Sequence, residues 1–158
     1  ASFPLSQLQA AALLPQLDSF RRFAAARQTS VDHLQGSLAD CPGLTQPPGY
    51  AVGDRDNTPA FYKLAWQIDS ALQCSRPQLI AAARAEGVPI DAGFRGFASR
   101  SKTRCRRDHD LPFGRLAAAG TLLLHHAALL GPDELMTQLA AGIRKVATAA
   151  AEGKLIDV

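Results

Sequence analysis

The chain has 158 residues, of which 47% are hydrophobic and 20% are charged, and its formal net charge is +3. This length and composition predict one folded domain with a substantial core and exclude a chain that is disordered throughout. No apolar run reaches the roughly 20 residues that a membrane-spanning helix needs, and the start lacks the pattern of a signal peptide. Three widely spaced cysteines without a CxxC pair argue against a disulfide framework and against zinc. We therefore expect a cytoplasmic protein with free thiols and no membrane partner.

The first predicted element is a long helix. Apolar side chains recur every three or four residues over positions 5–38, which is typical of an amphipathic helix with one buried side. Pro15 lies inside this segment. Because proline removes a backbone donor and clashes with the preceding turn, we expect a kink there or two abutting helices.

The next segments predict a loop, a strand and a second helix. Proline and glycine crowd residues 41–59, so regular structure stops there. Residues 60–68 alternate as a one-sided strand, in which Tyr62, Leu64, Trp66 and Ile68 face the core. Ser75 is a typical helix cap, and a glycine twelve positions later ends the helix over 75–86.

The rest of the chain completes the predicted layers. Residues 88–90 and 121–125 predict two further strands, separated by an irregular basic segment (91–111) and a short helix (112–119). A last helix opens after Gly131, with an apolar stripe at Leu135, Leu139, Ile143 and Val146. The order of elements predicts an α+β fold with a small, mainly antiparallel sheet of about three strands covered by helices.

The sequence contains no complete active site. GxSxG, HExxH, GxGxxG and the phosphate-binding P-loop are all missing. Asp108, His109 and Asp110 are neighbours in sequence, whereas a catalytic triad requires convergence in space. The adjacent His125 and His126 point to opposite faces of a strand, which argues against a shared metal ion. We therefore expect no metal site.

The lysines do not fit covalent catalysis either. A Schiff-base lysine is usually desolvated or placed beside another cation. The four lysines, Lys63, Lys102, Lys145 and Lys154, lack apolar or small-residue surroundings in the sequence. We therefore expect no catalytic residue in this chain.

Six basic residues are concentrated within 13 positions: Arg95, Arg100, Lys102, Arg104, Arg106 and Arg107. This pattern indicates either a solvated basic face or a site for phosphate or another anion. Phe94 and Phe97 lie among these charges. Nucleic-acid binding requires exposed aromatic rings, and we interpret these two rings as anchors of the loop, so we expect no nucleic-acid partner.

Several segments, taken in order, resemble one family, the DegT/DnrJ/StrS-type sugar aminotransferases. Residues 6–17 (SQLQAAALLPQL) resemble its "SE(F/L)QAA…QL" segment, and residues 27–44 resemble its "R…L…PGL…P" passage. Residues 61–63 are similar to its "YYK" strand, residues 76–89 (RPQLIAAARAEGVP) to its "RDxLxxxLxxEGI" helix, and residues 92–94 to an "AGY" element. Residues 122–146 resemble its "LPxxPxLTxxxIxxV" ending, so the resemblance covers nearly the whole chain.

The resemblance implies the small C-terminal domain of a fold-type I aminotransferase. Residues 1–40 are then the interdomain helix, residues 41–158 the small α+β domain, and the catalytic large domain is absent from this sequence. Enzymes of the family bind pyridoxal phosphate through a large-domain lysine and transfer an amino group from glutamate or glutamine to a keto-sugar or cyclitol. The chain alone is then expected to bind no cofactor and to be inactive. The implied partners are a second copy in a homodimer, the large domain of the same enzyme, and a small-molecule amino acceptor.

The sequence departs from the family at two sites. The family often carries "NxR" just before the first helix, and here Ser2 is the remaining candidate for a contact with the cofactor phosphate. The loop after "AGY" is also unusual, and we predict that it faces an anionic substrate such as a diphosphate. The predicted substrate-loop residues are Phe94, Arg95, Arg100, Lys102 and Arg104. The alternative is a stand-alone anion-binding, ligand-binding or interaction module that uses the basic loop 95–107.

Overall fold

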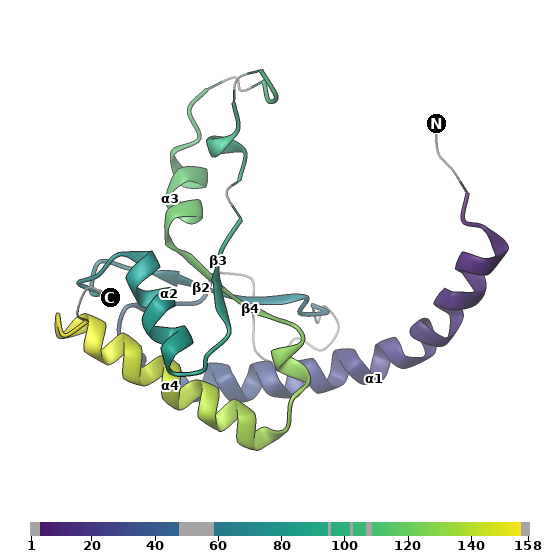
Figure 1. Cartoon of the computed structure of the whole chain (residues 1–158), viewed down its shortest axis with the longest axis horizontal. Coiled ribbons are helices and arrows are strands. Elements are labelled where there is room, and N and C mark those ends of the chain that lie inside the picture. The colour runs from purple at the N-terminus through teal and green to yellow at the C-terminus, as the bar shows by residue number, and fades with distance from the viewer. Residues whose placement is uncertain (1–3, 48–58, 95, 102, 107–108, 156–158) are drawn as a thin grey trace.

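The computed structural model describes residues 4–47, 59–94, 96–101, 103–106 and 109–155. Its longer elements are α1 (Gln7–Ser37), β2 (Lys63–Ile68), α2 (Arg76–Ala85), α3 (Pro112–Gly120), β4 (Thr121–His125) and α4 (Asp133–Ala151). Its shorter elements are β1 (Leu44–Thr45), β3 (Ile90–Ala92) and the 3-10 helices η1 (Phe97–Ser99) and η2 (Ala128–Leu130). The expected α+β fold with a long N-terminal helix is confirmed (Figure 1). Among the described residues, no helix is long and apolar enough to cross a membrane.

The sheet has four strands in the order β1-β2-β4-β3, and all neighbouring pairs are antiparallel. The additional strand is β1, which pairs Leu44 with Ile68 inside a segment expected to be loop. Strand β3 begins at Ile90, two positions later than predicted. Pro89 explains the shift, because proline has no N–H to contribute to a strand ladder.

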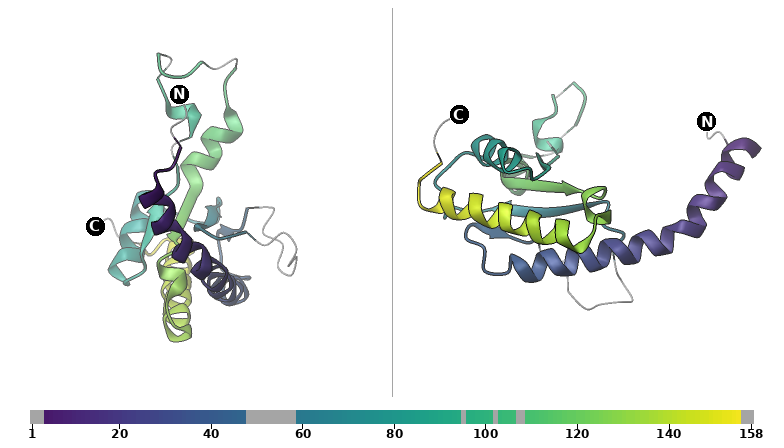
Figure 2. Two further views of the ribbon diagram at one scale, coloured as in Figure 1. Left: turned by 90° about the vertical axis from the view of Figure 1, so that its right-hand side faces the viewer. Right: turned by 60° about the horizontal axis from the view of Figure 1, so that its bottom comes forward.

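The core lies between one face of the sheet and the helices α1, α2 and α4. Leu64 and Trp66 of β2 and Leu124 of β4 are almost fully buried there, against Leu34 of α1 and Met136 of α4. Each such side chain contributes roughly 1.5–3 kcal/mol when it leaves water. The C-terminal half of α1 and α4 run side by side below the sheet (Figure 2).

One predicted core residue is wrong. Tyr62 was expected to face the core, but 65% of it is exposed, whereas its neighbour Phe61 is only 5% exposed. Phe61 adopts a positive φ of 44°, which turns the chain just before β2 begins at Lys63. The strand alternation therefore does not extend back to Tyr62, whose ring instead stacks on His126 with the ring centroids 5.0 Å apart.

Helix α1 has two different halves. Ser6 caps it with a capping box, in which the Ser6 Oγ accepts from the Gln9 N–H and the Gln9 Oε1 accepts from the Ser6 N–H. The helix is continuous through Pro15 rather than divided in two, and its N-terminal part curves away from the sheet (Figures 1 and 2). Only the C-terminal half contributes buried side chains. From just before the helix to Phe23, large apolar side chains are exposed: Leu5, Leu8, Leu13, Leu14, Leu17, Phe20 and Phe23.

Candidate functional site: the arm

Residues 93–120 form a projection that stands away from the sheet, and we call its described residues the arm (Figure 1). Its base is fixed by hydrogen bonds from several elements. The Gly93 N–H donates to the Thr121 carbonyl at 3.0 Å. Arg76 of α2 donates through Nη1 to the carbonyls of Ala118, at 2.5 Å, and of Thr121, at 3.3 Å. The arm is therefore attached to the core at a defined position.

Close approach at this base requires a glycine. A Cβ added to Gly93 would lie 2.5 Å from the Cβ of Thr121, closer than side-chain carbons approach one another. Thr121 is β-branched and has little rotamer freedom. The two sides of the arm therefore converge where the sequence places a residue without a side chain.

The arm carries two adjacent cavities. The apolar cavity, of about 480 Å³, is lined mainly by aromatic and aliphatic side chains that include Phe94, Phe97, Leu111, Phe113 and Ala117. The basic cavity, of about 1030 Å³, is lined by Phe94, Phe97, Ser99, Arg100, Ser101, Thr103 and Arg104, together with Gly96. Phe94 and Phe97 line both cavities, so an apolar wall and a basic wall meet at two aromatic rings.

These aromatic rings are exposed and contact cations. Phe94 is 70% exposed and Phe97 is 62% exposed, so these two rings, interpreted above as anchors of the loop, do meet the requirement for exposed aromatic rings. The Cζ of Arg100 lies 5.0 Å from the ring centroid of Phe97, and the Nζ of Lys63 lies 4.3 Å from that of Phe94. Such cation–π contacts contribute about 0.5–1 kcal/mol at exposed sites. The reason given against a nucleic-acid partner therefore fails, and the expected absence of one stays a prediction.

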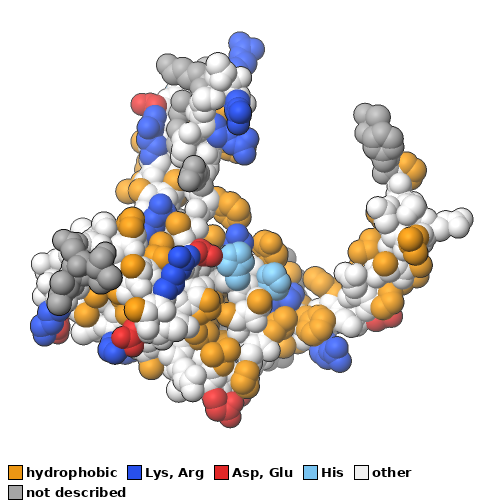
Figure 3. All heavy atoms as spheres, viewed as in Figure 1, with side chains coloured by type: hydrophobic (Ala, Val, Ile, Leu, Met, Phe, Trp, Pro, Cys, Tyr) orange, Lys and Arg blue, Asp and Glu red, His pale blue; other side chains and the backbone are white. Residues whose placement is uncertain are grey.

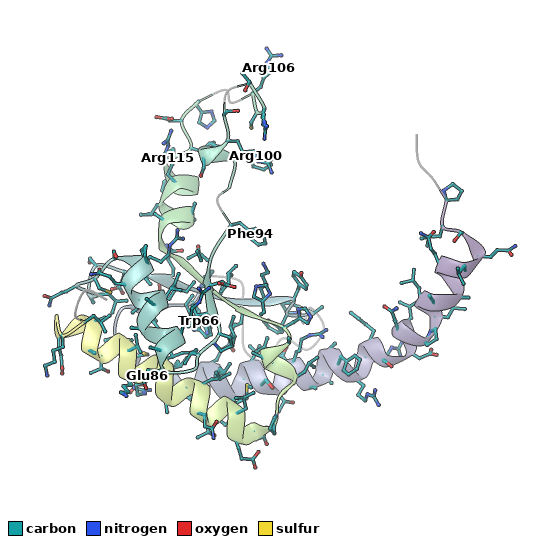
Figure 4. All side chains as sticks on the ribbon, viewed as in Figure 1. Trp66, Glu86, Phe94, Arg100, Arg106 and Arg115 are labelled. Atoms are coloured by element: carbon teal, nitrogen blue, oxygen red, sulfur yellow. The ribbon has the colours of Figure 1, made fainter. Side chains whose placement is uncertain are left out.

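The structure brings three of the predicted substrate-loop residues together. Phe94, Arg100 and Arg104 all line the basic cavity. Figure 4 shows Arg100 and Arg115 on opposite sides of the arm, and Figure 3 shows basic side chains along its length. Arg95 and Lys102 lie outside the described residues, as does Ser2, the candidate for the cofactor phosphate. The assignment of these residues to substrate and cofactor stays a prediction.

Sequence reasoning missed the apolar cavity. Phe113 of α3 lines this cavity and is 84% exposed, and Leu116 of the same helix is 68% exposed without lining it. A usable signal was present, because two large apolar residues three positions apart lie on the same side of a helix. In a helix of nine residues beside a charged loop, that side is a candidate surface rather than a core face.

The described lysines do not fit a pyridoxal phosphate site. Lys145 pairs with Glu86 at 2.7 Å, and Lys154 pairs with Glu152 at 2.7 Å. Lys63 lies over the rings of Tyr62 and Phe94. None of these three is the desolvated amine that Schiff-base chemistry requires, so no step through the cofactor is assigned to them.

The other ionisable groups bear on the requirements of a metal centre and of a reactive thiol. No cluster of three or more metal-ligating side chains occurs in the part of the chain that the structure describes. All three cysteines are free. Burial raises the pKa of the Cys41 and Cys74 thiols, which leaves them less reactive than an exposed thiol.

The comparisons with known proteins identify the family. Residues 1–141 match the DegT/DnrJ/EryC1/StrS aminotransferase family, and the chain belongs to that family. No curated protein matches the chain.

Solved structures share the fold. The aminotransferase from Psychrobacter cryohalolentis matches with a TM-score of 0.78 and 23% identity, over 95% of this chain and 40% of that one. DesI in the presence of its TDP-sugar product matches with a TM-score of 0.59 and 26% identity, over 93% of this chain and 34% of that one. The E. coli GDP-4-keto-6-deoxy-D-mannose-3-dehydratase with bound hydrated PLP matches with a TM-score of 0.63 and 14% identity, over 82% of this chain and 33% of that one. The chain therefore spans at most 40% of the length of these structures.

Proposed function

We propose that the chain is the C-terminal domain of a pyridoxal-phosphate-dependent aminotransferase that passes an amino group from glutamate or glutamine to a keto-sugar or cyclitol. The observation that carries the proposal is the family match over residues 1–141, combined with a fold that corresponds to only 40% of a similar aminotransferase. On this proposal the chain is not catalytic alone. Family membership does not favour the alternative of a stand-alone binding module.

The cofactor belongs to the rest of the parent protein in this proposal. One similar structure contains hydrated pyridoxal phosphate, which supports the same cofactor for the parent. When bound, this cofactor supplies the electron sink for amino transfer, and the protein supplies position and charge. The lysines described above do not fit its attachment, so we place the attachment outside this sequence.

The arm is the proposed contribution of this chain to substrate binding. Arg100 and Arg104 line the basic cavity, and a planar guanidinium matches the oxygens of a phosphate group. The apolar cavity beside it offers the rings of Phe94, Phe97 and Phe113. A sugar linked to a nucleoside diphosphate has both an anionic diphosphate and a flat base, which suits two such cavities side by side. Two similar structures contain or act on sugars of this kind, carrying TDP or GDP.

Exposed apolar surface supports the proposed partners. The N-terminal half of α1 presents leucine and phenylalanine side chains to solvent, including Leu8, Leu14 and Leu17. Exposed patches of this kind usually mark interaction surfaces. We propose that the large domain of the same enzyme and a second copy of the protein cover this surface.

Kinetics of the protein made from its complete reading frame test the role of the arm. Arg100→Gln and Arg104→Gln are expected to raise KM for the amino acceptor about tenfold each, with a smaller change in kcat, because each removes a charge-assisted contact. Arg115→Gln is the matched control, since Arg115 pairs with Asp110 and lines neither arm cavity. Equal changes in KM for all three substitutions would contradict the assignment of Arg100 and Arg104 to substrate binding.

A further inference from the structure

A third cavity, of about 420 Å³, lies beyond the edge strand β3, between α2, η2 and α4. It shares no lining residue with the two arm cavities. The residues that line it are Arg84, Gly87, Pro89, Ile90, Asp91, His125, Ala127, Ala128, Leu135 and Leu139. Nothing in the proposed role of the arm uses this cavity.

The interior of this edge cavity is apolar. Ile90 and Leu139 are each 3% exposed, and Leu135 is a partly buried side chain packed against the core. Pro89 and two alanines add further aliphatic surface. A concave, mostly apolar hollow with a few convergent polar groups is the usual form of a small-molecule site.

The rim of the edge cavity places opposite charges side by side. The Arg84 Nη2 forms an ion pair with the Asp91 Oδ1, and the Arg84 Nε donates to the Ile90 carbonyl at 3.2 Å. These contacts use only part of the five N–H donors of a guanidinium. On the other side, the His125 Nε2 lies 3.6 Å from the Asp91 Oδ2. The side chains of Arg84, Asp91 and His125 are 57%, 46% and 42% exposed, so a ligand can reach them.

The charges restrict the ligand. A ligand whose head group carries only a negative charge could pair with Arg84 but would be repelled by the carboxylate of Asp91. A ligand whose head group carries only a positive charge could pair with Asp91 but would be repelled by the guanidinium of Arg84. A head that carries both charges avoids both repulsions, because its carboxylate pairs with the guanidinium and its ammonium pairs with the Asp91 Oδ2. The apolar interior then accepts an aliphatic body.

We propose that the edge cavity is a binding site for an aliphatic α-amino acid. The zwitterionic head lies at Arg84 and Asp91, and the hydrocarbon side chain lies against Ile90, Leu135 and Leu139. This site goes beyond the proposed aminotransferase function, because it involves no residue of the arm and no cofactor.

Two-dimensional NMR of the 158-residue chain, titrated with L-leucine, tests the proposal. We expect leucine to shift the amide signals of the cavity residues, Ile90, Ala128 and Leu135 among them. Two matched probes keep the same branched end: 4-methylpentanoate lacks the ammonium group, and 3-methylbutylamine lacks the carboxylate. Each probe is expected to bind at least about tenfold more weakly than leucine. Each lacks one of the two charge-assisted contacts with the rim, and its remaining charge is repelled by the rim residue of the same sign. Glycine, which lacks the aliphatic body, is expected to give no shift at these positions.

Substitutions complete the test. Asp91→Asn is expected to weaken leucine binding about tenfold, and Arg84→Gln provides an independent second variant if the first alters the fold. Asp110→Asn is the matched control, since it removes the carboxylate of another exposed ion pair, on the arm. The proposal is overturned if leucine shifts no cavity residue, if the two single-charge probes bind as tightly as leucine, or if Asp110→Asn weakens binding as much as the rim variants do.

Discussion

The sheet with its covering helices and the arm use the same residue types in opposite ways. In the sheet, Leu64, Trp66 and Leu124 are at most 1% exposed. In the arm, Phe94 and Phe113 are 70% and 84% exposed. The difference lies in what surrounds each region, because three helices close over one face of the sheet, whereas the arm projects into solvent (Figure 1). Large apolar residues therefore stabilise the fold in one region and remain available for ligands or partners in the other.

The largest expected difference in stability is between replacing a core leucine and replacing an arm phenylalanine. Leu64→Ala leaves a cavity among fully buried neighbours and is expected to cost about 2–5 kcal/mol of unfolding free energy. Phe113→Ala removes a larger but exposed side chain and is expected to change stability by no more than about 0.5 kcal/mol. Urea unfolding followed by circular dichroism measures both. If Phe113→Ala lowered the unfolding free energy as much as Leu64→Ala does, the arm would have to be part of the core.

A smaller effect is expected at the base of the arm. Gly93→Ala forces a Cβ against Thr121 and is expected to cost about 1–3 kcal/mol, the usual range for overpacking. Gly114→Ala is the matched control, because its new Cβ meets only the Leu111 Cβ at an ordinary 3.5 Å inside α3. There the substitution is expected to be neutral or to stabilise by up to about 1 kcal/mol. Thermal unfolding of the two variants distinguishes them, and a neutral Gly93→Ala contradicts the fixed base.

The two helix caps give the next contrast. The Ser75 Oγ accepts from the Gln78 N–H at 3.4 Å at the start of α2, which packs on the core. Ser75→Ala is expected to cost about 1 kcal/mol. The equivalent Ser6→Ala is expected to cost less, because it frays an end of α1 that contributes no buried side chain. Chemical unfolding of both variants provides the comparison, and a larger loss at Ser6 would contradict the independence of that end.

The smallest effect concerns pH. The Asp40 Oδ1 accepts from the Arg144 Nη2 at 2.8 Å, and this hydrogen bond holds the pKa of Asp40 below its ordinary value of 3.8. Because the folded pKa is the lower one, the stabilisation is fully present above about 3.8 and is lost as pH falls through the folded pKa. Asp40→Asn is therefore expected to be slightly less stable than the unsubstituted chain at neutral pH, with the difference vanishing in acid. Unfolding midpoints across pH measure it, and a difference that grows in acid would contradict the sign.

Local patterns in the sequence predicted the helices and most of the sheet. The predicted cap at Ser75 and the strand over residues 121–125 are both confirmed, because a cap residue and a short apolar run are local signals. Tyr62 was misplaced because Phe61 has a positive φ just before β2 begins, and a strand pattern does not encode such a turn. Strand β1 was missed because two residues among prolines carry no pattern of their own.

The candidate sites were less predictable. The basic cluster in the sequence indicated an anion site, and the arm brings Arg100 and Arg104 to one cavity. The edge cavity had no sequence signal, because Arg84, Asp91 and His125 come from α2, β3 and β4. Only the pairing of β3 with β4, and of α2 with the free side of β3, brings these three charges together.

The most direct test of the proposed function locates the attachment of pyridoxal phosphate. The protein made from the complete reading frame is loaded with the cofactor, reduced with borohydride and mapped by peptide mass spectrometry. We predict a single modified lysine that lies outside these 158 residues. Modification of Lys63, Lys102, Lys145 or Lys154, or a complete frame that binds no pyridoxal phosphate, would contradict the assignment of this chain as the C-terminal domain of such an enzyme.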